Sequence, residues 1–128
     1  MPTNRPAAVG AALAISDWVV SLVGDGGAMY SPQALWSAAH YRARVIFVVF
    51  NNRRYGVLQN VARSLGYANA MAGKFVGMET VDPAIDFAAL SRSMGTPHIL
   101  APTRDAVLAA FAEAVQRDGP TVIEIPVR

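Results

Sequence analysis

Residues 19–52 read VVSLVGDGGAMYSPQALWSAAHYRARVIFVVFNN and decide the fold. Two valine-rich apolar runs, at 18–23 and 44–50, lack the polar alternation of a half-exposed strand, which is typical of parallel strands buried on both faces. Residues 24–27 predict a turn after the first run. Ser31 and the proline after it predict an N-cap and the first position of a helix that ends near residue 41. The stretch therefore predicts one strand–helix–strand unit of a parallel sheet.

The rest of the chain continues this alternation of helices and strands. In chain order, the expected elements are a helix at 6–15, a short helix at 55–65, a long irregular loop at 66–83, a helix at 86–94 capped by Asp86, a strand at 98–101, a helix at 104–117 capped by Thr103, and a strand at 121–126. We therefore expect an α/β fold with a doubly wound parallel sheet flanked by helices, in a single domain over residues 1–128.

The composition limits the classes of partner. Hydrophobic residues make up 53% of the 128 residues and charged residues 16%, against about 25% charged in a typical soluble domain. We expect part of the apolar surface to be covered by a partner. The net charge is only +2 and the basic residues are scattered, so we expect no nucleic acid partner.

The sequence also limits the possible cellular location and the possible cysteine chemistry. The chain contains no cysteine, which excludes disulfides and thiolate metal sites. No apolar run approaches the roughly 20 residues of a membrane span, and the N-terminal residues lack the layout of a signal peptide. We expect a cytoplasmic protein that does not enter a membrane.

Two oxygen-bearing side chains follow the ends of the two strands predicted from residues 19–52. Asp25 offers a carboxylate and Asn52 an amide oxygen, and the carboxyl ends of parallel strands are where such sheets bind ligands. Mg²⁺ takes six oxygens and often keeps phosphate oxygens among them. Gly26 and Gly27 would let the backbone approach a diphosphate closely. Either motif alone is more typical of a plain turn or loop, and their combination favours a metal–diphosphate site.

At this point the residues match a known pattern. Gly24-Asp25-Gly26, followed after a helix and a strand by Asn51-Asn52, resembles the diphosphate-binding motif of thiamine diphosphate enzymes. The longer stretches GDGGAMYSPQALWSAAHY and FVVFNNRRYGVL are similar to the benzoylformate decarboxylase branch of that family. The likeness runs from Pro6 to the final GPTVIEIPV, which is nearly the whole chain.

The resemblance implies a thiamine diphosphate-binding fold, with thiamine diphosphate and Mg²⁺ as cofactors. It implies that Asp25 and Asn52 ligate Mg²⁺ through side-chain oxygens and that Arg54 does so through its backbone carbonyl. Besides Asp25 and Asn52, the residues that it places along the cofactor are Gly26, Gly27, Tyr30, Tyr55, Gly56 and Val57, with Leu58 toward the thiazolium. The Arg53-Arg54 pair departs from the family, where small residues are usual.

The family implies a 2-oxo acid decarboxylase or lyase, although its chains are several times longer. The family's glutamate that activates the cofactor lies on a domain with no counterpart here, so we expect a C-terminal cofactor-binding domain truncated at its N-terminus and inactive alone. It would work as a homo-oligomer or with a partner chain that carries the pyrimidine-binding domain. No catalytic residue is predicted, because His40 and His98 lack acidic partners nearby in sequence. An acetolactate synthase-like carboligase domain and a non-catalytic fragment or assembly partner remain alternatives.

Overall fold

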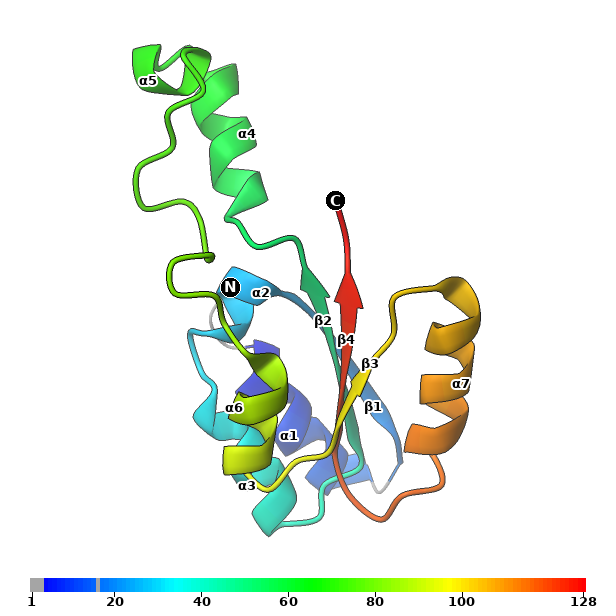
Figure 1. The fold of residues 1–128 in the computed structure, drawn as a ribbon. Coiled ribbons are helices and arrows are strands. Elements are labelled where there is room, and N and C mark those ends of the chain that lie inside the picture. Colours follow the sequence, from blue (N-terminus) through cyan, green and yellow to red (C-terminus); the bar gives the residue numbers. More distant parts are fainter. Residues whose placement is uncertain (1–3, 16) are drawn as a thin grey trace.

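The computed structural model describes residues 4–15 and 17–128, and the strands of this part of the chain form one parallel sheet (Figure 1). The predicted domain also takes in residues 1–3 and 16, which lie outside the described residues. In the order β1-β2-β4-β3, the strands are β1 (Val19–Gly24), β2 (Val45–Asn51), β4 (Thr121–Pro126) and β3 (His98–Leu100). Each neighbouring pair is parallel.

Helices cover both faces of this sheet. The helices of the described residues are, in chain order, α1 (Asn4–Ile15), α2 (Asp25–Ala28), α3 (Gln33–His40), α4 (Gly56–Ser64), α5 (Ala68–Met71), α6 (Phe87–Ser93) and α7 (Arg104–Ala114). Alternate residues of β2 enter two cores: Val45, Phe47 and Val49 pack with α1, α3 and α6, whereas Ile46 and Val48 pack with α7. This arrangement explains the unbroken apolar run of β2 and confirms the predicted doubly wound parallel sheet.

The predicted caps of two helices are confirmed. The Asp86 carboxylate accepts a hydrogen bond of 2.8 Å from the Ala89 N–H at the start of α6, and the Thr103 hydroxyl accepts one of 3.2 Å from the Ala106 N–H at the start of α7. Each bond satisfies an N–H group that has no partner inside its helix. Local sequence therefore fixes where these two helices begin.

Two predictions about residues 24–41 need correction. The predicted turn is the short helix α2, in which the N–H of Met29 bonds to the Gly26 carbonyl at 3.2 Å. The helix α3 begins at Gln33, so its N-cap position is Pro32 instead of Ser31; the N–H groups of Ala34 and Leu35 bond three residues back, in a first turn tighter than an α-helix.

Two predictions in the second half of the chain also need correction. The expected loop at 66–83 contains the helix α5, in which the Met71 N–H donates to the Tyr67 carbonyl. Helix α7 ends at Ala114, three residues before the predicted end. The N–H groups of Gln116 and Arg117 bond three residues back instead of four, so the last turn is tighter than an α-helix.

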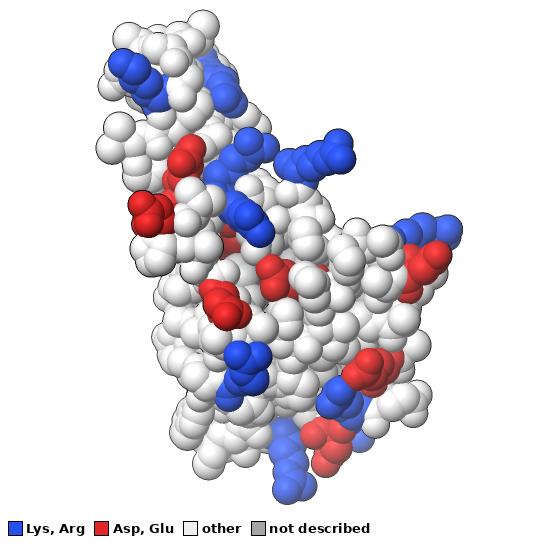
Figure 2. All heavy atoms as spheres, viewed as in Figure 1, with Lys and Arg blue, Asp and Glu red and all other residues white. Residues whose placement is uncertain are grey.

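Helices α4 and α5 project beyond the carboxyl ends of the strands, away from the layered body (Figure 1). Large apolar side chains are exposed on this projection, among them Val57, Val61 and Met71. Others lie on the edge strand β1, where Val20 and Leu22 are exposed. The prediction that this strand is buried on both faces is therefore wrong. The face in Figure 2 shows charged side chains scattered between wide uncharged areas. No helix among the described residues is long and apolar enough to cross a bilayer.

Candidate functional site

Asp25 lies at the carboxyl end of β1, where the chain passes from the last strand residue, Gly24, into α2. Gly24 is paired in register with Phe50 near the end of β2, so the chain leaves both strands at the same edge of the sheet. The Asp25 residue is only 2% exposed. Its carboxylate atom Oδ2 accepts a hydrogen bond of 2.9 Å from the hydroxyl of Thr80. A buried carboxylate therefore occupies the predicted position.

Asn51 and Asn52 form a tight turn at the end of β2. The side-chain oxygen of Asn51 accepts from the Arg53 N–H, and that of Asn52 accepts from the Arg54 N–H, each at 3.1 Å. These bonds are the Asx turns that asparagine favours. Arg53 has a positive φ of 59°, which is uncommon for a residue with a side chain. The turn thus holds the Asn52 amide and the Arg54 backbone close together.

The loop after β1 touches the turn after β2 at Gly26, and the turn packs on itself at Gly56. A Cβ added to Gly26 would lie 2.3 Å from a ring carbon of Tyr55, and one added to Gly56 would lie 2.9 Å from the Asn52 side-chain nitrogen. Neither position has room for a side chain, since real Cβ contacts are longer. The structure therefore brings together Asp25, Gly26, Asn52, Tyr55 and Gly56 from the predicted site.

The other predicted contact residues are less enclosed. Gly27 is half-buried, and a Cβ on it would lie 3.1 Å from Val23. The side chains of Tyr30 and Val57 are 64% and 77% exposed, and Leu58 is exposed as well. Within the described part of the chain, the Tyr30 hydroxyl makes no hydrogen bond to Asp25 or Asn52. Their predicted roles along the cofactor stay predictions.

Residues 78–80, which we call the strap, run beside the turn and were not anticipated from the sequence. Glu79 forms an antiparallel bridge with Arg54. The bridge consists of a bond from the Tyr55 N–H to the Met78 carbonyl at 2.9 Å and one from the Thr80 N–H to the Arg53 carbonyl at 3.0 Å. It does not use the carbonyl of Arg54, which is the predicted metal ligand.

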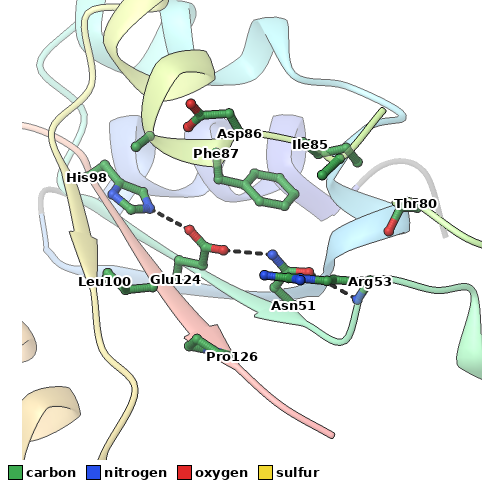
Figure 3. Close-up of a pocket in the computed structure, with 12 residues that line it drawn as sticks. Asn51, Arg53, Thr80, Ile85, Asp86, Phe87, His98, Leu100, Glu124 and Pro126 are labelled. Carbon is green, nitrogen blue, oxygen red and sulfur yellow. Dashed lines mark hydrogen bonds and ion pairs between the residues drawn. The ribbon is translucent and has the colours of Figure 1, made fainter. Parts of the chain in front are cut away.

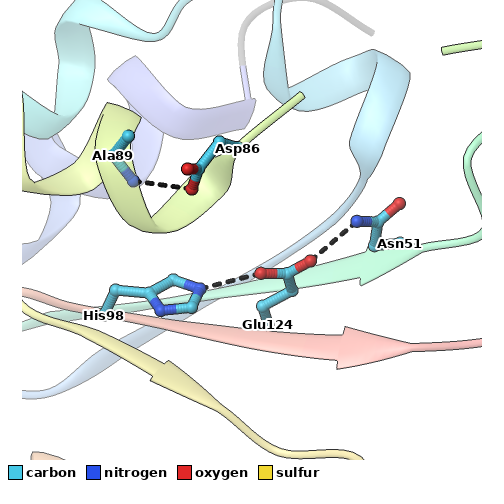
Figure 4. Close-up of polar contacts among 5 residues, drawn as sticks. All are labelled: Asn51, Asp86, Ala89, His98 and Glu124. Atoms are coloured by element: carbon cyan, nitrogen blue, oxygen red, sulfur yellow. Dashed lines mark hydrogen bonds and ion pairs between the residues drawn. The ribbon is translucent and has the colours of Figure 1, made fainter. Parts of the chain in front are cut away.

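A polar cluster lies beside the turn, in a cavity of about 320 Å³ at the carboxyl ends of β2, β4 and β3 (Figure 3). Asn51 Nδ2 donates to Glu124 Oε1 at 2.7 Å, and His98 Nε2 lies 2.8 Å from Glu124 Oε2 (Figure 4). The absence of an acid near His98 in sequence was therefore misleading, because β3 and β4 are neighbours and supply Glu124. Only that strand pairing could have revealed the contact.

Arg5 of α1 lies behind the loop after β1. It is 1% exposed, and its Nη1 donates to the Ala28 carbonyl at the end of α2, at 3.1 Å. Burial lowers the pKa of Arg5 to about 10, because desolvation disfavours the charged form. Among the described residues, Nε and Nη2 have no hydrogen-bond partner. A buried cation thus fixes the back of the loop.

Comparisons with known proteins identify the family. Residues 1–125 match the family model described as thiamine pyrophosphate enzyme, C-terminal TPP-binding domain. The chain belongs to this family. It is a thiamine pyrophosphate (thiamine diphosphate) binding domain, as the resemblance predicted.

Curated relatives and solved structures agree with this membership. The chain is 38% identical over 122 residues to benzoylformate decarboxylase of Pseudomonas aeruginosa, covering 94% of this chain and 22% of that protein. It is 36% identical to a putative acetolactate synthase large subunit of Mycobacterium tuberculosis, covering 95% and 24%. The structure of Rhodococcus jostii thiamine diphosphate-dependent 4-hydroxybenzoylformate decarboxylase matches with a TM-score of 0.89 and 36% identity, covering 100% and 23%. The chain thus spans about a quarter of the length of these relatives.

The residues at the strand ends fit a magnesium ion in such a domain. The set would be one carboxylate, one amide oxygen and one carbonyl, which are the hard oxygen ligands that Mg²⁺ takes. Thr80 uses only part of the acceptor capacity of Asp25, and the amide oxygen of Asn52 has a second lone pair beyond its bond to Arg54. The described residues contain no group of three His, Cys, Asp or Glu suited to a metal, so a single-carboxylate site is the arrangement they offer.

Proposed function

We propose that this domain holds the diphosphate of thiamine diphosphate through Mg²⁺, as part of a 2-oxo acid decarboxylase that resembles benzoylformate decarboxylase. Asp25 and Asn52 would ligate the metal through side-chain oxygens and Arg54 through its carbonyl. The observation that carries the proposal is the buried Asp25 carboxylate at the end of β1, joined through Thr80 to the turn after β2.

The remaining predicted residues would bind and orient the cofactor. Gly26 lets the Tyr55 ring pack against the loop after β1, and Gly56 lets the Asn52 side chain pack against the start of α4. When bound, thiamine diphosphate supplies the carbanion and the electron sink of 2-oxo acid chemistry. The chain spans about a quarter of the length of its relatives, and we propose that the 128 residues anchor the cofactor and are inactive by themselves.

The exposed apolar residues support an assembled state. Val20 and Leu22 on β1, and Val57 and Val61 on α4, expose large apolar areas at the edge of the sheet and beyond the site. Exposed apolar surface of this kind is typical of interfaces. We propose that the domain functions in a homo-oligomer or with a chain that carries a pyrimidine-binding domain.

Titration calorimetry with thiamine diphosphate and Mg²⁺ tests the proposal. We expect the 128-residue chain to bind thiamine diphosphate only when Mg²⁺ is present. Asp25→Asn, which keeps the shape and the bond to Thr80 but removes the charge, should weaken this binding at least about 100-fold, a loss of roughly 3 kcal/mol. Asp105→Asn on exposed α7 is the matched control and should bind like the wild type.

Two outcomes would contradict the proposal. If Asp25→Asn binds thiamine diphosphate as well as the wild type does, Asp25 is not the metal anchor. If the wild-type chain does not bind thiamine diphosphate, the alternative of a non-catalytic fragment is favoured. Turnover of benzoylformate by the 128 residues alone would contradict their inactivity.

An acetolactate synthase-like carboligase is the second candidate function. It is favoured by the 36% identity to the putative acetolactate synthase large subunit. Both functions need the same diphosphate anchor, so calorimetry on this chain does not separate them. Assays of the chain assembled with a pyrimidine-binding partner would do so, by comparing decarboxylation of benzoylformate with condensation of pyruvate.

A further inference from the structure

Thr80 is the residue that connects the two halves of the site. Its hydroxyl donates to Asp25 Oδ2 at 2.9 Å, across 55 positions of sequence. Its backbone N–H donates to the Arg53 carbonyl at 3.0 Å. Asp25 follows β1, and Arg53 lies in the turn after β2. One residue from the strap therefore bonds to both strand ends.

The strap is itself held firmly against the turn. The Met78 carbonyl accepts from the Tyr55 N–H at 2.9 Å and from the side chain of Gln59 at 3.2 Å. Gln59 is only 4% exposed, and it fixes the strap to the first turns of α4. Thr80 lies at the rim of the cavity, on the opposite side from His98 (Figure 3). Its position is thus set by bonds that do not depend on Asp25.

From these contacts we infer that Thr80 is a positioning residue for the metal ligand Asp25. The inference rests on the proposed function, because it concerns how the same site is held. A carboxylate that binds a metal is usually oriented by a hydrogen bond to its other oxygen. The Thr80 hydroxyl fixes Oδ2 and leaves Oδ1 and the remaining lone pairs for Mg²⁺. The same residue sets the spacing between Asp25 and the turn that carries Asn52 and Arg54.

The test compares Thr80→Val with Thr80→Ser. Valine has the shape of threonine without the hydroxyl, whereas serine keeps the hydroxyl and loses the methyl group. We expect Thr80→Val to weaken Mg²⁺-dependent binding of thiamine diphosphate 10- to 100-fold, the usual effect of removing a partner of a metal ligand. Thr80→Ser should restore binding to within about threefold of the wild type, a rescue that a loss of packing would not show.

The matched control is Thr121→Val at the start of β4. Its hydroxyl is also buried but has no hydrogen-bond partner among the described residues, so the same substitution should leave binding unchanged. Amide chemical shifts of the cofactor-free protein give a second readout. Thr80→Val should shift the amides of residues 25–28 and of Arg53, and Thr80→Ser should shift them much less.

The possible failures point to different conclusions. If the wild type binds and Thr80→Val binds equally well, the inference is wrong and the proposed function stands. Thr80→Ser binding as weakly as Thr80→Val would also overturn it, because the hydroxyl would not be the cause. If the wild-type chain binds neither Mg²⁺ nor thiamine diphosphate, the proposed function is wrong, and so is this role of Thr80. Unshifted amides at 25–28 in Thr80→Val would overturn the inference without any cofactor present.

Discussion

The loop after β1 (residues 25–28) and the turn after β2 (residues 51–55) both follow parallel strands that are paired in register, yet they are held in different ways. In the loop, Asp25, Gly26 and Ala28 are buried, and Arg5 contacts it from behind. In the turn, Arg53 and Arg54 are exposed, and the backbone passes through a positive φ. The loop is positioned mainly by close packing and the turn mainly by hydrogen bonds.

This difference predicts how each half of the site responds to mutation. A closely packed loop should be sensitive to added volume, because protein interiors have few spare voids. A hydrogen-bonded turn should be sensitive to the loss of polar partners, because buried donors and acceptors are costly when left alone. Substitutions that add volume on one side and remove hydrogen bonds on the other therefore test the comparison directly.

The largest effect is expected for Gly26→Ala. The added methyl group would lie 2.3 Å from the Tyr55 ring, so the ring or the loop must move. We expect a loss of about 1–3 kcal/mol in the free energy of unfolding, as for other overpacked sites. Binding of thiamine diphosphate with Mg²⁺ should weaken at least about tenfold, measured by urea denaturation and calorimetry in parallel.

Gly24→Ala is the control for this prediction. A Cβ on Gly24 meets nothing within 4 Å, and its φ of −75° suits any residue. We expect Gly24→Ala to fold and bind like the wild type. Equal effects of the two substitutions would show that close packing at Gly26 is not what positions the loop.

An intermediate effect is expected for Glu124→Ala on the other side of the site. The substitution removes the acceptor of Asn51 Nδ2 and the partner of His98. Both are partly buried, so we expect a loss of about 1–2 kcal/mol in stability, from leaving polar groups unpaired. Glu124→Gln keeps an acceptor for Asn51 and should recover most of this loss in thermal and urea unfolding.

Glu113→Ala on α7 serves as the matched control. Glu113 pairs with Arg117 one turn away, and both side chains are substantially exposed. Such surface pairs contribute only about 0.3–0.5 kcal/mol. If Glu124→Ala costs no more than Glu113→Ala, the cluster does not hold the turn after β2.

The same contrast explains what could be predicted from the sequence. The strands and most helix starts follow local signals, such as the apolar run of β2 and the capping side chains of Asp86 and Thr103. Asp25, Gly26 and Asn52 were predicted as site residues because a short motif encodes them, and their roles stay predictions. The α2 helix was missed because two glycines in four residues are typical of a turn.

The long-range contacts beside the turn after β2 have no local signal, unlike the two Asx bonds inside it. Thr80 meets Asp25 across 55 positions, and Asn51 meets Glu124 across 73. Neither pair has a spacing that periodicity or capping could reveal. They depend on the order β1-β2-β4-β3 and on where the segment at 66–83 crosses the site. Thr80 was expected only as part of a loop, and Glu124 only as a strand residue.

The smallest effect is expected for Arg53→Gly, which acts on the backbone of the turn. Arg53 has a φ of 59°, and Arg42, between α3 and β2, has a φ of 50°. A positive φ destabilises a residue that has a side chain by about 1–2 kcal/mol, and glycine avoids this strain. Glycine also has more freedom in the unfolded chain, which offsets about 0.5–1 kcal/mol of that gain. We expect a gain of up to about 1 kcal/mol in the free energy of unfolding.

Arg42→Gly separates the backbone effect from any role of the Arg53 side chain. Arg42 has a similar φ, and its ion pair with Asp118 is exposed and long, at 3.8 Å. If backbone strain is the only term, both substitutions should raise stability by similar amounts in urea denaturation. A loss of stability in Arg53→Gly beside a gain in Arg42→Gly would show that the Arg53 side chain, which lines the cavity with Asp86 and Glu124, holds the turn in addition to its hydrogen bonds.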